Sequence, residues 1–323
     1  MEYRALGSTG LQVSAVGLGA WEIGGAVTLT FERLGAVAHG YGHVDDRAAV
    51  ELVHHCEDLG INFVDTVPIY GDGHSEELLG RALEGRRDRW IVATKGGHGA
   101  TDGRAWTDFS EARILSQMDE SLQRLRTDYV DVYLLHGPGP EDIAQGECLS
   151  ALSKLKAAGK ARFVGVSLGR NGVGVDLCER GVADVLQQSI GLTSPSAIAE
   201  LLPAARAAGV GIVARGAFAS GFLAGAVSDS TQFPDDDRRS WMDEGYKAQL
   251  TRLADGLRRL VTPDRTLAQL CIRFVLDQPG VSTVITGSKS LAHMAENAKA
   301  ADLPTLTAEE VQRLRRLGFA TPQ

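Results

Sequence analysis

The sequence predicts an α/β protein, a (β/α)8 TIM barrel with an N-terminal β-hairpin and extended loops at the C-terminal face. Eight short apolar runs alternate with longer stretches whose apolar residues recur at helical spacing. The runs are apolar throughout, as in strands covered on both faces. The GxGxxG turn expected in the alternative fold, an open doubly wound sheet, does not occur. We therefore expect residues 1–323 to form one barrel domain.

The expected elements follow one another in the order that a barrel requires. A hairpin over Tyr3–Leu6 and Leu11–Val13 comes first, joined by a Gly-Ser-Thr-Gly turn. The barrel strands are expected near Ala15–Gly19, Asn62–Asp65, Trp90–Thr94, Tyr129–Leu135, Phe163–Ser167, Val185–Gln188, Gly211–Arg215 and Ser282–Thr286. Helices with capping residues or terminal glycines are expected over Asp46–Leu59, Ser110–Leu125, Glu147–Ala158, Ser196–Ala208, Thr266–Leu276 and Leu291–Ala300.

Two connections are longer than a plain barrel needs. Glu22–Asp45 follows the first expected strand, and Ala217–Tyr246 follows the seventh. Both belong to the C-terminal face, so they are expected to wall or cover a site there, although ordinary surface insertions are nearly as consistent with them. A third segment, Gly96–Gly99, is expected to be a flexible loop at the same mouth. Trp21 and Trp106 fit either an apolar pocket wall or core packing.

Composition excludes several classes of function. The net charge of −8 argues against binding to nucleic acid. The four cysteines are widely spaced and predict neither disulfides nor a zinc site, which suits the cytoplasm. Signal peptides and membrane-spanning runs are not expected. Adjacent His54 and His55 diverge on a helix, so no metal site is predicted.

Polar residues mark the carboxyl ends of the expected strands, which in a barrel point into the active-site mouth. Any one of them has an ordinary structural explanation, as a cap, a solvated side chain or a packing residue. Such a regular series favours a catalytic site. In chain order the series is Asp65, Lys95, His136, Ser167, Gln187, Arg215 and Gly287, and Tyr70 follows Asp65 on the next loop.

Four of these residues can perform acid–base chemistry together. A free tyrosine has a pKa of about 10, and a lysine ammonium beside Tyr70 is expected to lower it. Asp65 would hold Lys95 in place. Tyr70 could then donate a proton to a carbonyl oxygen as hydride reaches the carbon. His136 could orient the same oxygen by a hydrogen bond.

These residues resemble the aldo-keto reductase family, in its bacterial branch related to potassium-channel beta subunits and to inositol- and sugar-linked reductases. The resemblance rests on Gly60–Thr66 with Tyr70-Gly71, on Ser75–Gly80, on Ala93–Lys95 and on Leu134–His136. It extends from Leu6 to about Pro304. It implies that the catalytic residues are Asp65, Tyr70, Lys95 and His136.

The resemblance also implies NADP(H) as the cofactor, held at the barrel mouth without a separate dinucleotide-binding domain. Ser167 and Gln187 match positions that hold the nicotinamide amide, and Arg215–Leu223 resembles the stretch along the pyrophosphate. Gly287–Ser290 resembles the loop that holds the adenosine phosphate. The implied cofactor contacts are Trp21, Asp65, Ser167, Gln187, Arg215, Gly216, Ala217, Phe218, Ser220, Gly221, Leu223, Gly287, Ser288, Lys289, His293, Glu296 and Asn297.

Several positions depart from the family pattern, and one is the Gly137-Pro138-Gly139 turn after His136, where the family more commonly has an Arg-containing turn. Leu168 stands where the family usually has Asn, while Ile190 and Gly191 replace a Tyr-Asn pair. The missing tyrosine would stack on the nicotinamide, so Ile190 is expected to cover the ring by apolar contact alone. The expected function is NADPH-dependent reduction of an aldehyde or ketone. The alternatives are an NADP-dependent sugar or polyol dehydrogenase and a non-catalytic NADP-binding regulatory subunit.

Overall fold

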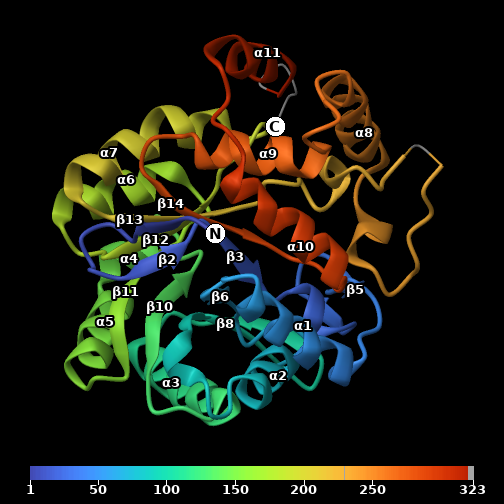
Figure 1. The fold of residues 1–323 in the computed structure, drawn as a ribbon. Coiled ribbons are helices and arrows are strands. Elements are labelled where there is room, and N and C mark those ends of the chain that lie inside the picture. The colour runs from blue at the N-terminus through green and yellow to red at the C-terminus, as the bar shows by residue number, and fades with distance from the viewer. Residues whose placement is uncertain (229, 319–323) are drawn as a thin grey trace.

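The computed structural model describes residues 1–228 and 230–318, and its centre is a closed barrel of eight parallel strands (Figure 1). Around the ring the order is β10-β11-β12-β13-β14-β3-β6-β7, so each strand neighbours the next one along the chain. The predicted fold class is therefore confirmed. The strands are β3 (Val16–Gly19), β6 (Phe63–Asp65), β7 (Ile91–Gly96), β10 (Val130–His136), β11 (Ala161–Ser167), β12 (Val185–Ser189), β13 (Gly211–Arg215) and β14 (Val281–Thr286).

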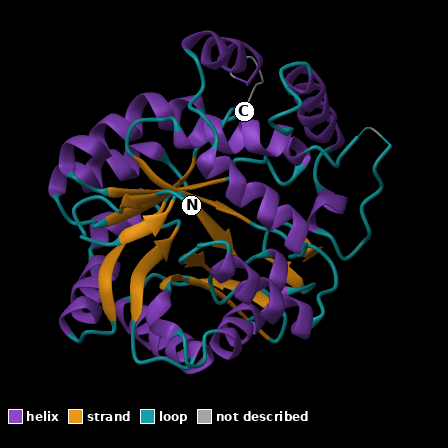
Figure 2. Cartoon of the chain, viewed as in Figure 1, coloured by secondary structure: helices purple, strands orange, loops and turns teal. Residues whose placement is uncertain are grey.

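Helices form a ring outside the barrel (Figure 2). Their starts follow the expected capping chemistry, since the side chains of Asp45 and Ser110 accept backbone N–H groups of the first turn. The α-helices are α1 (Asp46–Asp58), α2 (His74–Ala82), α3 (Glu111–Leu125), α4 (Pro140–Gln145), α5 (Glu147–Ala157), α6 (Asn171–Arg180), α7 (Leu202–Ala208), α8 (Glu244–Arg258), α9 (Leu267–Leu276), α10 (Leu291–Lys299) and α11 (Ala308–Gly318). None of the described helices is long and apolar enough to cross a membrane.

The N-terminal hairpin closes the bottom of the barrel. Its strands β1 (Tyr3–Ala5) and β2 (Gln12–Ser14) pair antiparallel, as predicted. Leu6, Leu11 and Val13 of this hairpin are buried in one apolar cluster with inward-facing residues such as Phe63 and Val132. Because the lower end is filled in this way, the open end of the barrel is the one formed by the carboxyl ends of its strands.

A second sheet of four strands, which the sequence analysis missed, stands beside that open end. It consists of β4 (Thr28–Phe31), β5 (Gly35–Ala38), β8 (His98–Thr101) and β9 (Arg104–Thr107), in the order β5-β4-β9-β8. The expectation of a flexible loop at Gly96–Gly99 is therefore wrong. Asp102 and Gly103 both have positive φ, 50° and 74°, which suits the two-residue turn joining β8 to β9. Trp106 lies on β9, and the Arg113 guanidinium sits 4.2 Å above its ring.

The two long connections meet over the mouth. Tyr41 and Asp237 form an isolated antiparallel bridge, and the Arg238 backbone N–H donates to Gly40 at 2.8 Å. The Trp241 indole donates to the carbonyl of Ala38 at 2.7 Å. In the described part of the segment 217–246, the helical structure before α8 is limited to 3-10 turns at Phe222–Ala224 and Arg238–Trp241. Residue 229 of this segment lies outside the described residues.

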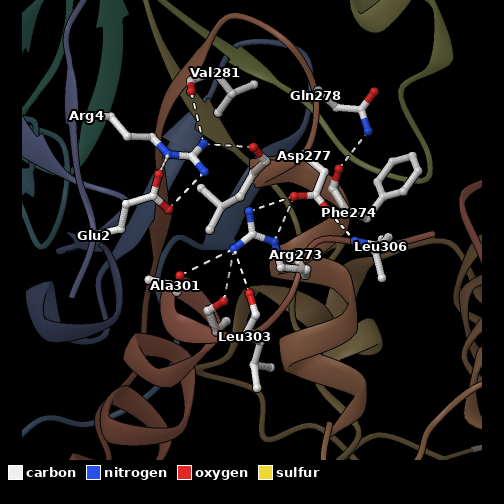
Figure 3. A network of polar contacts seen from close by, with 12 residues as sticks. Glu2, Arg4, Arg273, Phe274, Asp277, Gln278, Val281, Ala301, Leu303 and Leu306 are labelled. Carbon is white, nitrogen blue, oxygen red and sulfur yellow. Dashed lines mark hydrogen bonds and ion pairs between the residues drawn. The ribbon is translucent and has the colours of Figure 1, made fainter. Parts of the chain in front are cut away.

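A buried polar network fixes the packing of α9 at the lower end of the barrel (Figure 3). The Arg273 guanidinium donates to Asp277 at 2.6 and 2.9 Å and reaches the carbonyls of Ala300, Ala301 and Leu303. Arg273 is only 3% exposed. The neighbouring guanidinium of Arg4 donates to the carbonyls of Leu276, at the end of α9, and Val281, at the start of β14, and so ties the hairpin to the same region.

We expect Arg273→Leu to lower the free energy of unfolding by about 3–5 kcal/mol, because it leaves Asp277 and three carbonyls without their buried partner. Urea unfolding followed by circular dichroism would measure this. Arg180→Leu is the matched control, since Arg180 forms an exposed pair with Asp176 whose loss should cost below about 1 kcal/mol. Equal losses in the two variants would contradict the role given to Arg273.

Candidate active site

The predicted catalytic side chains converge at the upper end of neighbouring strands. Asp65 is the last residue of β6, Lys95 is the fifth residue of β7, and His136 ends β10. The parallel register pairs Leu134 with Lys95 and Asp65 with Ala93, which places these ends at one level. Tyr70 lies on the loop between β6 and α2. The sequence order of strand-end residues thus becomes a spatial cluster.

A chain of buried hydrogen bonds fixes the centre of this cluster. The Lys95 ammonium donates to Asp65 Oδ2 at 2.7 Å and to the Thr66 carbonyl at 2.9 Å. The Gln187 amide donates to Asp65 Oδ1 at 2.7 Å, and the Ser167 hydroxyl donates to Gln187 Oε1 at 2.9 Å. Both oxygens of the Asp65 carboxylate are therefore occupied. The Lys95 ammonium is therefore held in one position, buried below the mouth of the barrel.

Tyr70 is held by an aromatic stack. Its ring lies parallel to the ring of Trp21, with centroids 5.0 Å apart and planes at 7°. The Lys95 ammonium lies 5.6 Å from the centroid of the Tyr70 ring. Trp21 is in turn covered by the guanidinium of Arg238 at 4.6 Å. Trp21 therefore orients the phenol that the sequence analysis assigned as the acid.

The expectation that Lys95 lowers the pKa of Tyr70 is wrong, because the surroundings of the phenol raise its pKa instead. Burial raises the pKa of Tyr70 well above its usual value, and the Asp65 carboxylate raises it further. Arg215 is the cation that opposes this rise. The physical reason is that the charge of Lys95 is largely compensated by Asp65 at 2.7 Å. Tyr70 is thus a neutral phenol, which is the form that donates a proton.

His136 is neutral as well. Burial lowers its pKa well below the usual value for histidine, and the positive charge of Lys95 lowers it further. Its Nδ1 atom is buried without a hydrogen-bond partner. The ring centroid of His98 lies 5.0 Å from that of His136, with the two planes close to perpendicular. His98 Nδ1 forms a hydrogen bond with the Thr107 hydroxyl at 2.8 Å. Sequence reasoning missed His98 because its strand β8 was taken for a loop.

A cavity of about 1520 Å³ opens above these residues. That volume exceeds a typical small-molecule pocket and gives room for a dinucleotide beside a substrate. Lys95, Ser167 and Leu223 do not line it; they lie buried behind it. The predicted site residues that do line it are Trp21, Asp65, Tyr70, His136, Gln187, Arg215, Gly216, Ala217, Phe218, Ser220, Gly221, Gly287, Ser288, Lys289, His293, Glu296 and Asn297.

Anion-binding groups lie along the rim of this cavity. Ser290 caps α10 through its side chain, leaving Ser288 and Lys289 just before the helix N-terminus, a favourable place for phosphate. Arg238 and Arg239 also line the cavity, although the sequence analysis did not select them. They belong to the charged run Asp235–Arg239, and nothing in the sequence shows that this run folds over the mouth. These residues fit an anionic cofactor.

Two of the residues that depart from the family pattern, Leu168 and Ile190, are buried in the core. Ile190 is fully buried in the main apolar cluster and does not line the cavity, so it does not cover a nicotinamide ring. Leu168 is also buried, and its side chain packs where a Cβ on Gly174 would lie. The guanidinium of Arg215 is fixed by hydrogen bonds to the Ser189 hydroxyl at 2.9 Å and to the carbonyl of Leu168 at 3.0 Å.

We expect Lys95→Met to lower the free energy of unfolding by about 3–5 kcal/mol, since Asp65 would stay buried without its cation. Chemical denaturation would measure the loss. The double variant Asp65→Leu/Lys95→Met should recover part of it, because no unpaired charge then remains. Lys156→Met, at an exposed ion pair with Asp184, serves as the control and should cost below about 1 kcal/mol. A Lys95 variant as stable as the control would contradict this account.

Comparisons with known proteins agree with this arrangement. The model of the Aldo/keto reductase family matches residues 15–318. The uncharacterized oxidoreductase YqkF of Bacillus subtilis is 32% identical over 324 residues, covering 98% of this chain and 96% of YqkF. A probable voltage-gated potassium channel subunit beta of Oryza sativa is 29% identical over 346 residues, covering 100% of this chain and 98% of that protein.

A solved structure matches over the same length. The crystal structure of an aldo/keto reductase from Klebsiella pneumoniae, in complex with NADP and acetate, aligns with a TM-score of 0.74 at 27% identity. The alignment covers 100% of this chain and 97% of that one. Together with the family match over residues 15–318, these likenesses show that the chain belongs to the Aldo/keto reductase family.

Proposed function

We propose that this chain binds NADP(H) and reduces an aldehyde or ketone to an alcohol, with Tyr70 as the proton donor. The observation that carries the proposal is a neutral phenol and a neutral imidazole, Tyr70 and His136, lining one large cavity in front of a buried Lys95–Asp65 pair. Two uncharged hydrogen-bond donors beside a fixed ammonium suit an oxygen that gains negative charge during the reaction.

The cofactor assignment is supported by the cavity and by the relative from Klebsiella pneumoniae that holds NADP. In this chain Ser288 and Lys289 would hold a phosphate, and the backbone of Gly216–Gly221 would follow the pyrophosphate. When bound, the cofactor supplies the hydride. Gln187 lines the cavity, but its amide is engaged by Asp65 and Ser167. Gln187 could form a hydrogen bond to the nicotinamide only through its second N–H or the remaining lone pair of its oxygen.

The proton would come from the hydroxyl of Tyr70 and go to the oxygen of the substrate carbonyl. His136 would donate one ring N–H to the same oxygen and set its direction. After the transfer the phenolate would be stabilised by the charge of Arg215, the cation that already opposes the rise in the pKa of Tyr70. Asp65 would act as a positioning residue, because it keeps the ammonium in place without contacting the substrate.

Tyr70→Phe is expected to lower kcat for aldehyde reduction by about 10²–10⁴-fold, because the proton donor is lost while the ring remains stacked on Trp21. NADPH oxidation with a panel of aldehydes, recorded at 340 nm, would measure it. The dissociation constant of NADP⁺ for the variant serves as the control for folding. Equal rates for both proteins would remove Tyr70 from the mechanism. NADP⁺ binding without turnover by the native chain would favour the regulatory-subunit alternative.

The pH dependence follows from the two shifted groups. The acid form of Tyr70 persists below its raised pKa, so its contribution is lost only as the pH rises past that value. The neutral form of His136 persists above its lowered pKa, so acid does not remove it near pH 6.5. We therefore expect kcat at saturating substrates to change less than about twofold between pH 6 and 9. A decline centred near pH 6.5 that vanishes in His136→Asn would contradict this.

A further inference from the structure

Glu22 places a carboxylate inside the cavity at the position where the proposed function needs a phosphate site. The residue begins the first long connection, directly after Trp21, and lines the cavity together with Ser288 and Lys289. One carboxylate oxygen lies 1.7 Å from where a Cβ on Gly287 would stand. Glycine at position 287 is therefore the residue that gives the carboxylate room at this loop.

Three cations surround this carboxylate, and each has other partners. Arg239 forms an ion pair with Asp237 at 2.6 Å. Arg238 donates to Ser220 at 3.1 Å and covers the ring of Trp21. The Lys289 ammonium donates to the backbone carbonyls of Tyr41 and His43 at 2.6 and 3.1 Å. Glu22 thus lies near three cations whose hydrogen bonds and ion pairs are formed with other groups.

Burial therefore prevails over attraction at Glu22. Desolvation raises the pKa of its carboxyl to about 7, although Arg239, Arg238 and Lys289 each lower it. The other ionisable groups facing it are the phenols of Tyr41 and Tyr70, whose pKa values are both raised, and Asp237 in its ion pair. His43 and His293 line the same cavity. Near neutral pH the carboxyl of Glu22 exchanges between its neutral and its ionised form.

We propose that Glu22 couples cofactor binding to the uptake of one proton: the dinucleotide binds the chain with Glu22 neutral, and the ionised carboxylate opposes its phosphates. The proton comes from solvent and goes to the carboxylate, so charge and atoms balance. This inference rests on the proposed binding of NADP(H). Its physical basis is that an anion near a partly desolvated carboxylate favours the protonated form.

The test measures the dissociation constant of NADP⁺ between pH 7 and 9, where a phosphate group with a second pKa near 6 is at least about nine-tenths ionised. For the native chain the constant should rise as the pH rises, by up to roughly 50-fold, because the neutral fraction of a group with a pKa near 7 falls in that proportion. Glu22→Gln keeps the shape but cannot ionise, so its constant should stay nearly flat and should be lower than the native one at pH 9.

A second readout counts the proton directly. Calorimetric titration with NADP⁺ at pH 8, in two buffers of different ionisation enthalpy, should show uptake approaching one proton by the native chain and less by Glu22→Gln. Glu32→Gln, at an exposed carboxylate of the same connection, should behave as the native chain. His43 and His293 are present in all three proteins, so any contribution from them cancels.

The outcomes separate the two proposals. Equal pH slopes and equal proton uptake in the native chain and Glu22→Gln would overturn the role of Glu22 while leaving the proposed function intact. A slope that disappears equally in Glu32→Gln would also overturn it, since a distant surface charge would then explain the effect. Failure of the native chain to bind NADP⁺ at any pH would overturn both proposals.

Discussion

The buried ion pair between Lys95 and Asp65 is the constraint on which the mouth of this barrel depends. Two opposite charges away from water are tolerated only when their remaining hydrogen-bonding capacity is used. Here Thr66 takes a second hydrogen of the ammonium, and Gln187 donates to the second oxygen of the carboxylate. Since β6 and β12 stand four strands apart in a ring of eight, the Gln187–Asp65 hydrogen bond spans the barrel interior.

That constraint also sets the electrostatics of the proposed proton donor. Asp65 engages the ammonium closely, and its carboxylate adds to the effect of burial, which is the main reason that the pKa of Tyr70 is raised. The same low exposure makes His136 neutral. Both groups therefore hold the proton that hydrogen bonding to a carbonyl oxygen needs.

The two long connections form the outer half of the site. Backbone contacts between Gly40, Tyr41 and the turn at Asp237–Arg238 join segments almost 200 residues apart in the sequence and bring Arg238 and Arg239 over the mouth. Glu22 lines the same cavity, where its carboxyl is desolvated. A carboxylate and the cations that would hold a phosphate thus line the same cavity, which links the proposed binding of the cofactor to proton uptake.

The sequence by itself determined the barrel, the positions of its strands and the order of polar strand ends, because apolar runs and strand-end residues are local signals in parallel sheets. It did not determine the β4–β5 and β8–β9 sheet, whose short strands lack a clear alternation. The Asp102-Gly103 turn was the signal that could have revealed its second hairpin.

Only the tertiary structure decided the rest. It placed Ile190 in the core, Arg238 and Arg239 over the cavity, and Glu22 against Gly287. It also reversed the expected pKa shift of Tyr70. These properties arise from contacts between segments far apart in the chain and from exclusion of water, and neither residue type nor spacing specifies how closely two charges approach or how deeply they are buried.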